Sequence, residues 1–265
     1  MSAIQVVGAQ AYLAGLGVVH ESVECLTHLA QVHHPAYGAR DFFVKYYFDD
    51  RGPKGLVNEV CGYVLADNSG LSVPDSSLIL MLPVDRLAEA HHAHARRLPT
   101  GAEVAVWATQ MVPGPQLPPN MEQAADVLRP WKGLPDLIAF DTWVQNADRS
   151  AGNLIRRGKG DIVLIDHGHL AGSVSWTPEL LQRDIDPAHP FLALWGGGIP
   201  DAINQGIMRA AEGHADCFHR AEAELKSLTS ALLDDSGDRI AILDFLKQRA
   251  DGSPDRMRRI LRLLV

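Results

Sequence analysis

Hydrophobic positions in the first half of the chain fall into short runs that are typical of β-strands. The runs are apolar, contain β-branched or aromatic residues, and are closed by turn residues. The strands expected from this pattern are Ile4–Leu13, Phe42–Phe48, Ser77–Pro83 and Val104–Met111. Two helices are expected between them, because apolar residues recur at helical spacing in Lys54–Ala66 and alanine is abundant in Val84–Arg97.

The second half of the chain has a different pattern. It opens with a proline-rich connector, Pro113–Pro119, which can continue neither a helix nor a sheet. Apolar residues then recur mainly at helical spacing, and one short strand, Asp161–Ile165, interrupts the helices. The helices expected are Glu122–Leu128, Leu137–Gln145, Ala202–Glu212, His214–Leu233, Arg239–Arg249 and Pro254–Leu264. We therefore predict an α+β fold with a β-rich N-terminal lobe at residues 1–112 and a helical lobe at residues 113–265.

Composition narrows the class of protein. The formal net charge is −8 and hydrophobic residues make up 46% of the chain, which is ordinary for a globular protein. The acidic balance argues against direct binding of nucleic acid or of an anionic membrane. Three scattered cysteines without a CxxC pair indicate a reducing compartment, and no run of apolar residues is long enough to span a membrane. We expect a cytoplasmic protein.

A histidine-rich segment, His91-His92-Ala93-His94, looks like a set of metal ligands. On a helix these side chains would spread around the axis instead of converging on one point. We therefore expect a solvated polar helix face here.

The candidate chemistry lies in the loop Asn146-Ala147-Asp148-Arg149-Ser150-Ala151-Gly152-Asn153 and in Asp166 at the end of the strand that follows. Phosphoryl transfer depends on positioning and on charge neutralisation more than on covalent chemistry. It requires one carboxylate beside the attacking hydroxyl, for which Asp148 is suited, and oxygen ligands for magnesium, for which Asn153 and Asp166 are suited. The structural alternative is a capped loop followed by a hairpin.

This loop, together with Leu164-Ile165-Asp166-His167-Gly168, resembles the catalytic loop and metal segment of HipA-like kinases, and it is also similar to those of phosphoinositide kinases. The resemblance implies a two-lobed, protein-kinase-like fold. It also implies that Asp148 is the catalytic base and that Asn153 and Asp166 bind Mg²⁺. Both families usually carry histidine where this chain has Ser150, so any supporting role of that imidazole is lost or is taken elsewhere, with His167 as a candidate.

The same resemblance covers three features of the first half of the chain. A strand lysine, Lys45, is followed by Asn58-Glu59 and then by Leu71-Ser72-Val73-Pro74, in the order of the family. By this resemblance Lys45 contacts the α- and β-phosphates of ATP, and Glu59 holds Lys45. A lysine inside an apolar strand is costly to bury without a partner, although an alternating strand that turns Lys45 to solvent is the alternative.

Two further parts of a nucleotide site are placed by the order of strands. A phosphate-covering loop is expected between Gly15 and Ser22, with Gly17 supplying flexibility and backbone N–H groups, although a plain hairpin turn fits equally well. The hinge that contacts adenine is expected at Gln110, Met111 and Val112.

Taken with the resemblance, these residues predict an ATP- and Mg²⁺-dependent kinase that transfers the γ-phosphoryl group to a hydroxyl, most readily a Ser or Thr of a protein. A phosphotransferase acting on a small molecule, of the aminoglycoside type, is the nearest alternative. A pseudokinase, which keeps the fold as a binding module, is the other. The expected partners are ATP and the phosphoacceptor, without direct nucleic-acid or membrane binding.

Overall fold

The computed structural model describes residues 4–48, 53–146, 148–181, 185–186, 188–196 and 198–262. The chain divides into two compact units, one formed by Met1–Leu56 and Pro74–Val112 and the other by Val57–Val73 and Pro113–Val265. The first unit is rich in strands and the second is mainly helical, so the α+β, two-lobed expectation is confirmed. In the structure the helical unit also contains residues 57–73, which the predicted division between residues 112 and 113 placed in the N-terminal lobe.

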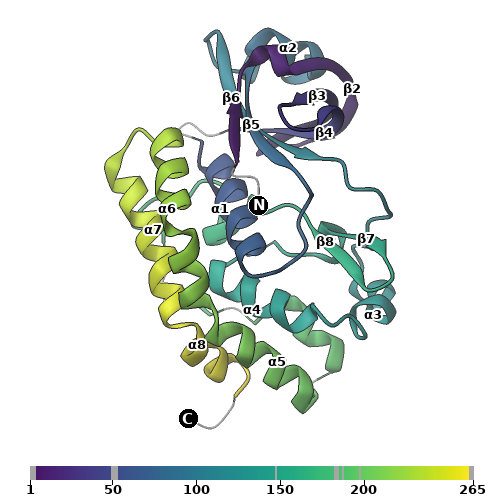
Figure 1. Ribbon diagram of the computed structural model, residues 1–265, viewed down its shortest axis with the longest axis vertical. Helices are drawn as coiled ribbons and strands as arrows, with labels where there is room; N and C mark the ends of the chain where they lie inside the picture. The colour runs from purple at the N-terminus through teal and green to yellow at the C-terminus, as the bar shows by residue number, and fades with distance from the viewer. Residues whose placement is uncertain are drawn as a thin grey trace. The chain divides into compact units, whose positions relative to one another are not determined.

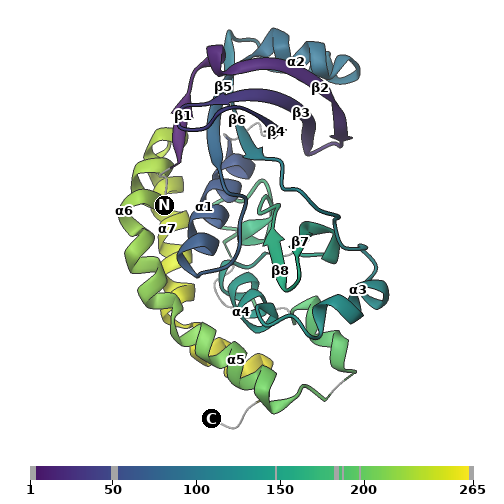
Figure 2. The same cartoon turned by 45° about the vertical axis from the view of Figure 1, so that its right-hand side comes forward.

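The first unit is built on one sheet of six strands in the part of the chain that is described (Figures 1 and 2). In sheet order the strands are β1 (Gln5–Val7), β5 (Ser77–Pro83), β6 (Glu103–Gln110), β4 (Gly38–Tyr47), β3 (Cys25–His34) and β2 (Tyr12–Glu21). The β1 and β5 pair is parallel and the other pairs are antiparallel. Alternate residues of the central strands, such as Phe42 and Val44, form the core, which leaves Phe43 and Lys45 on the opposite face.

Two predictions for the start of the chain are wrong. The run Ile4–Leu13 is divided by a 3-10 turn at Ala9–Ala11, so β1 and β2 are separate strands. Gly15 and Gly17 lie inside β2 and not in a loop, because the strand absorbs them at irregularities in its pairing with β3. The turn comes later, where Ser22 closes it by accepting a hydrogen bond from the Cys25 N–H at 3.0 Å.

The predicted helix Val84–Arg97 is also divided. Helix α2 spans Val84–Ala90, and a 3-10 helix, η2, spans His92–Arg97. His91, at the break, is fully buried, so the expectation of a solvated histidine face is wrong for this residue.

His91 belongs to a chain of hydrogen bonds inside the first unit. Its Nδ1 lies 2.8 Å from Glu21 Oε1, its Nε2 lies 3.2 Å from His28 Nδ1, and His28 Nε2 lies 3.1 Å from the Tyr12 hydroxyl. An ionised carboxylate can only accept, so His91 donates from Nδ1 to Glu21. Burial, reinforced by the neighbouring His91, lowers the pKa of His28 to about 4.

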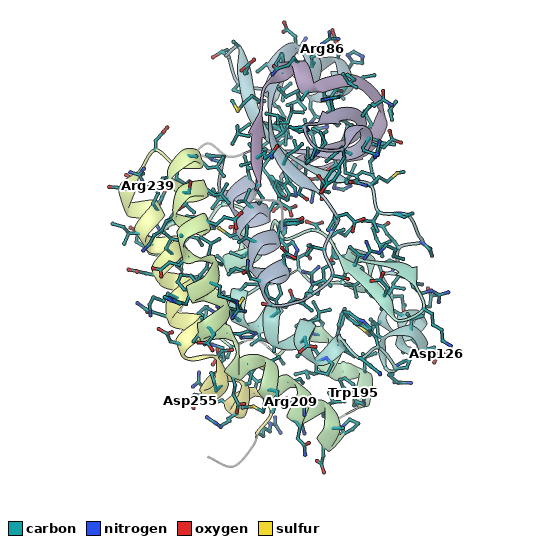
Figure 3. All side chains as sticks on the ribbon, in the orientation of Figure 1. Arg86, Asp126, Trp195, Arg209, Arg239 and Asp255 are labelled. Carbon is teal, nitrogen blue, oxygen red and sulfur yellow. The ribbon has the colours of Figure 1, made fainter. Side chains whose placement is uncertain are left out.

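The second unit is made mainly of helices. They are most of α1 (Lys54–Asn68), then α3 (Met121–Leu128), α4 (Leu134–Val144), α5 (Asp201–Glu212), α6 (His214–Leu232), α7 (Ser236–Asp251) and α8 (Ser253–Ile260). Each overlaps a predicted helix; the last two residues of the predicted Pro254–Leu264 lie outside the described residues. Charged side chains such as Arg209 and Asp255 project outward from α5 and α8 (Figure 3). None of the described helices is long and apolar enough to cross a membrane.

The helices carry a small sheet formed by β7 (Leu154–Gly158) and β8 (Asp161–Leu164). Ser72 extends it on one side, since its carbonyl accepts from the Leu164 N–H at 2.8 Å. The proline-rich connector extends it on the other side through a bridge between Gln116 and Ile155. Two segments that are distant in sequence therefore hold the hairpin that separates Asn153 from Asp166.

Candidate active site

The loop that carries Asp148 begins where α4 ends. Gln145 takes a left-handed conformation with φ of 52°, which stops the helix, and the Asn146 N–H bonds back to the Asp141 carbonyl at 2.9 Å. Ala147 of the predicted catalytic loop lies outside the described residues. Asp148 is exposed, whereas the next residue, Arg149, is buried. The loop therefore presents one carboxylate to solvent and anchors itself through the neighbouring side chain.

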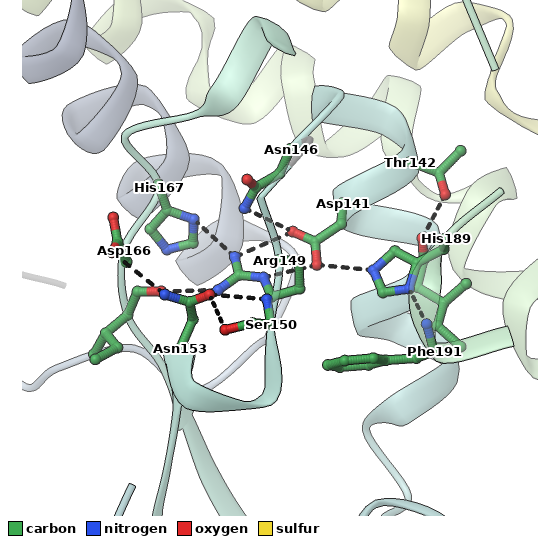
Figure 4. A network of polar contacts seen from close by, with 12 residues as sticks. Asp141, Thr142, Asn146, Arg149, Ser150, Asn153, Asp166, His167, His189 and Phe191 are labelled. Atoms are coloured by element: carbon green, nitrogen blue, oxygen red, sulfur yellow. Dashed lines mark hydrogen bonds and ion pairs between the residues drawn. The ribbon is translucent and has the colours of Figure 1, made fainter. Parts of the chain in front are cut away.

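Arg149 is the centre of a buried polar network (Figure 4). Its Nε and Nη2 donate to the two oxygens of Asp141 at 2.8 and 3.1 Å, and its Nη1 donates to the Ile165 carbonyl at 2.8 Å. Both side chains of the ion pair are inaccessible to solvent. Burial by itself would raise the pKa of Asp141, but the Arg149 charge, with His189, outweighs it and lowers the pKa to about 2. One guanidinium thus joins α4, the loop that carries Asp148 and the segment that precedes Asp166.

The backbone of Asp166 is held on both sides. Arg149 binds the carbonyl before it, and the His167 N–H after it donates to Glu59 Oε2 at 2.8 Å. Asp166 itself has φ of 63°, a left-handed conformation that costs a residue with a Cβ of the order of 1 kcal/mol or more. Gly62 leaves the space that the His167 side chain occupies, because a Cβ at position 62 would lie 2.3 Å from the His167 Cβ. Strain held in place by surrounding bonds is typical of a functional residue.

Asn153 and Asp166 are brought together by the end of the hairpin. The Ile165 N–H donates to the Asn153 carbonyl at 3.0 Å, and the Asn153 Nδ2 donates to Asp166 Oδ2 at 3.3 Å. The amide oxygen of Asn153 accepts from the Ser150 N–H at 2.9 Å and from its hydroxyl at 3.0 Å. Ser150, the departure from the family pattern, therefore sets the direction of the Asn153 amide.

These oxygens fit a hard cation with one condition. Mg²⁺ is usually bound through one or two protein oxygens, with water and phosphates completing the shell. Asp166 offers such an oxygen, but an amide oxygen has two acceptor positions and both of those on Asn153 are used by Ser150. Ligation through Asn153 therefore requires it to give up a bond to Ser150. Elsewhere in the described ranges, no group of three or more His, Cys, Asp or Glu side chains is placed to hold a metal ion.

Two buried contacts of this unit were not expected from the sequence. Asn58 is fully buried, and its Nδ2 donates to the carbonyl oxygens of Gly168, Leu170 and Ser173 at 2.6 to 2.8 Å. His189 binds Asp141 with 3.1 Å between Nε2 and Oδ2. The signal for Asn58 was its place in the Asn58-Glu59 pair, but nothing local marked Asp141 or His189.

In the first unit, the sheet register places Gly17 two strands away from Lys45 and one row along the sheet. Gly17 is paired with Leu29, and Leu29 with Phe43, while Lys45 lies in the next row on the same face. Lys45 is half-buried, with its Nζ 5.6 Å from the centre of the Tyr47 ring. A side chain at Gly17 would meet open space. Gly17 therefore leaves its own backbone open to close approach of a ligand.

The predicted hinge residues lie at the end of β6. Gln110 is the last residue of the strand, its N–H donates to the Ser76 carbonyl at 2.9 Å, and the Met111 N–H donates to the Asp41 carbonyl at 2.8 Å. Val112 is buried and is the last residue of the first unit. The roles of these residues, and the pairing of Lys45 with Glu59, stay predictions.

Comparison with known proteins adds the family. No curated protein matches the sequence. A family model described as HipA-like kinase matches residues 38–172, which is half of the chain and contains Lys45, Glu59, Asp148, Asn153 and Asp166. The matched segment runs from the start of β4 into the segment that Asn58 and Glu59 hold. The chain therefore belongs to the HipA-like kinase family.

Proposed function

We propose that this HipA-like kinase transfers the γ-phosphoryl group of ATP to a hydroxyl in a Mg²⁺-dependent reaction, with Ser or Thr of a protein as the acceptor. The observation that carries the proposal is the conformation of Asp166. Its backbone is strained, bonded on both sides, and aimed so that its carboxylate meets the Asn153 amide. A purely structural hairpin end has no need of a non-glycine residue in this conformation.

The roles of the chain's own residues follow from their exposure and contacts. Asp148 is exposed at the head of the loop, where it can accept the proton of an incoming hydroxyl. Asp166, with Asn153 once it turns from Ser150, would hold magnesium, which when bound neutralises the charge of the phosphates. Lys45 would contact the α- and β-phosphates, with Glu59 as its partner. Gly17 would leave room for the phosphates, while Gly15 and Ser22 complete that part of the site.

Adenine would bind at Gln110, Met111 and Val112, where the chain leaves β6. The N–H groups of Gln110 and Met111 already donate to the carbonyl oxygens of Ser76 and Asp41, so the remaining backbone groups of this segment would bind the edge of the purine. This part of the proposal rests on the order of the strands and on the family.

One observation favours the pseudokinase as a second candidate. Ser150 makes two hydrogen bonds to the oxygen that Asn153 would offer to the metal. If these bonds persist with nucleotide, the chain binds ATP weakly and without turnover.

The test measures nucleotide binding and transfer separately. Thermal unfolding is followed with Mg-ATP and with ATP plus chelator, and labelled γ-phosphate is followed into a Ser/Thr peptide mixture or into aminoglycosides. We expect the larger stabilisation with Mg-ATP and label in the peptides. Equal shifts with and without Mg²⁺ would remove the metal assignment. Binding without transfer would establish the pseudokinase, and label in the aminoglycosides would establish the small-molecule enzyme.

A further inference from the structure

His189 lies outside the segment that matches the family, yet it contacts the buried network of the candidate active site (Figure 4). It precedes the 3-10 helix η5 (Pro190–Trp195) and is buried. Its two ring nitrogens have different partners. Nε2 lies 3.1 Å from Asp141 Oδ2, and Nδ1 lies 3.1 Å from the backbone N–H of Phe191.

These partners decide the state of the ring. The Phe191 N–H can only donate, so Nδ1 must carry the lone pair and accept. The proton of the neutral ring is then on Nε2, where it is donated to the Asp141 carboxylate. His189 therefore caps η5 with one nitrogen and binds the active-site network with the other.

The segment that bears His189 is itself firmly held. Arg249 donates to the carbonyl oxygen of Ile185 at 3.2 Å and to those of Thr142 and Trp143, at the end of α4, at 2.6 and 2.7 Å. At the other end, Arg129 donates to the Leu194 carbonyl at 3.0 Å. His189 thus donates to Asp141 from a fixed position, and this bond restricts the rotation of the Asp141 carboxylate.

The contacts form one continuous path. His189 and Asn146 donate to Asp141, and the Asp141 carboxylate binds the fork of Arg149 through both oxygens. Arg149 directly follows Asp148, and its third nitrogen binds the carbonyl of Ile165, which directly precedes Asp166. A rotation of the Asp141 carboxylate therefore moves the Arg149 guanidinium. That guanidinium links the backbone beside Asp148 to the backbone beside Asp166.

We infer that Asp141 and His189 are positioning residues of the kinase reaction: they orient Arg149, and through it they set Asp148 and Asp166 relative to each other. The inference rests on the proposed function. Loss of the His189 bond leaves the fold and the nucleotide ligands in place but lets the guanidinium tilt. Small misplacement of reacting groups costs up to about 100-fold in rate, so the effect falls on kcat more than on KM.

Two substitutions separate the two nitrogens of His189. His189→Asn keeps an acceptor at the position of Nδ1, and Asn is a good cap, but it loses the donor to Asp141. His189→Gln places an Nε2 donor the same number of bonds from the Cα as in histidine, but it loses the acceptor for the Phe191 N–H. Thr229→Val is the matched control, because it deletes a buried hydrogen bond to the Leu225 carbonyl in the same unit, away from the network.

The readouts are kcat, KM and the NMR signal of the Arg149 Nε–H, which is protected from exchange while it is bonded to Asp141. We expect His189→Asn to lower kcat by about 10- to 100-fold with KM within about threefold, and to broaden or shift the Nε–H signal. His189→Gln should restore kcat to within about threefold of the wild type and keep the signal, although it melts earlier. Thr229→Val should melt earlier without changing kcat or the signal.

The reverse order overturns the inference. If His189→Asn is active and His189→Gln is not, the histidine serves only as the cap of η5. An unchanged Arg149 signal in His189→Asn would overturn it as well. If the wild type transfers no phosphate, the proposed function fails, while the Nε–H signals of the two variants still decide whether His189 orients Arg149.

Discussion

Arg149 provides the sharpest test of how the candidate site is held together. Replacing it with Met removes the two bonds to Asp141 and the bond to the Ile165 carbonyl while nearly conserving volume. Both members of the pair are inaccessible to solvent, so Arg149→Met leaves a buried carboxylate without its counter-charge. Such a change costs about 3–5 kcal/mol. Because His189 and Asn146 still donate to Asp141, we expect a loss near the lower end, about 3 kcal/mol.

The dependence on pH should change sign. In the wild type the pKa of Asp141 is lowered from 3.8 to about 2, which corresponds to stability of the order of 2 kcal/mol. This contribution is fully present above the unfolded pKa and is lost as the pH falls from 3.8 towards 2. Without Arg149, burial dominates and raises the pKa of Asp141. Folding then favours the protonated acid, and the variant becomes more stable as the pH falls from neutrality.

The assay is urea unfolding of the wild type, Arg149→Met, Asp141→Asn and the double variant, at neutral pH and at about pH 4.5. The double variant contains no unpaired charge. Its loss of unfolding free energy should therefore be smaller than the sum of the two single losses by at least about 1 kcal/mol. Losses that simply add, together with no gain in stability of Arg149→Met at the lower pH, would refute the pairing.

Three further predictions test the other assignments. Asp148→Ala should cut turnover by about 10²–10⁴-fold with folding and ATP affinity intact, because the side chain is exposed; collapse of ATP affinity would make it a structural or metal residue. Loss of Lys45 and loss of Glu59 should each lower kcat/KM, and the double variant should lose little more than either one. Losses that multiply would show that the two side chains do not act as a pair. The pKa of His28, about 4 when folded and 6.5 as a free side chain, predicts stability that is full above pH 6.5 and falls by up to roughly 3 kcal/mol towards pH 4. His28→Phe should flatten that loss in urea unfolding, and an unchanged slope would assign it to other groups.

The local hydrophobic pattern was sufficient to predict the bounds of a strand or helix where one or both of its faces are buried. The strand Ser77–Pro83 has the predicted bounds, and His214–Leu232 differs from its prediction by one residue, because an apolar run or a helical repeat records burial directly. Pattern failed at Gly15 and Gly17. Glycine usually marks a turn, but an edge strand tolerates it where the pairing is irregular. Pattern also failed at His91, since burial of a histidine depends on partners that come from other strands.

The sequence by itself determined the order of the chemistry: a loop with Asp148, a hairpin, and a strand that ends in Asp166. These residues lie close along the chain, and the Asn153 and Asp166 side chains, 13 residues apart, are joined by the hairpin. Only the tertiary structure decided what holds them. Asn58 reaches a carbonyl 110 residues away, and His189 reaches Asp141 across 48 residues. A hydrogen bond between distant segments leaves no periodic trace in either one, because its partner is chosen by packing of the whole unit and not by local backbone preference.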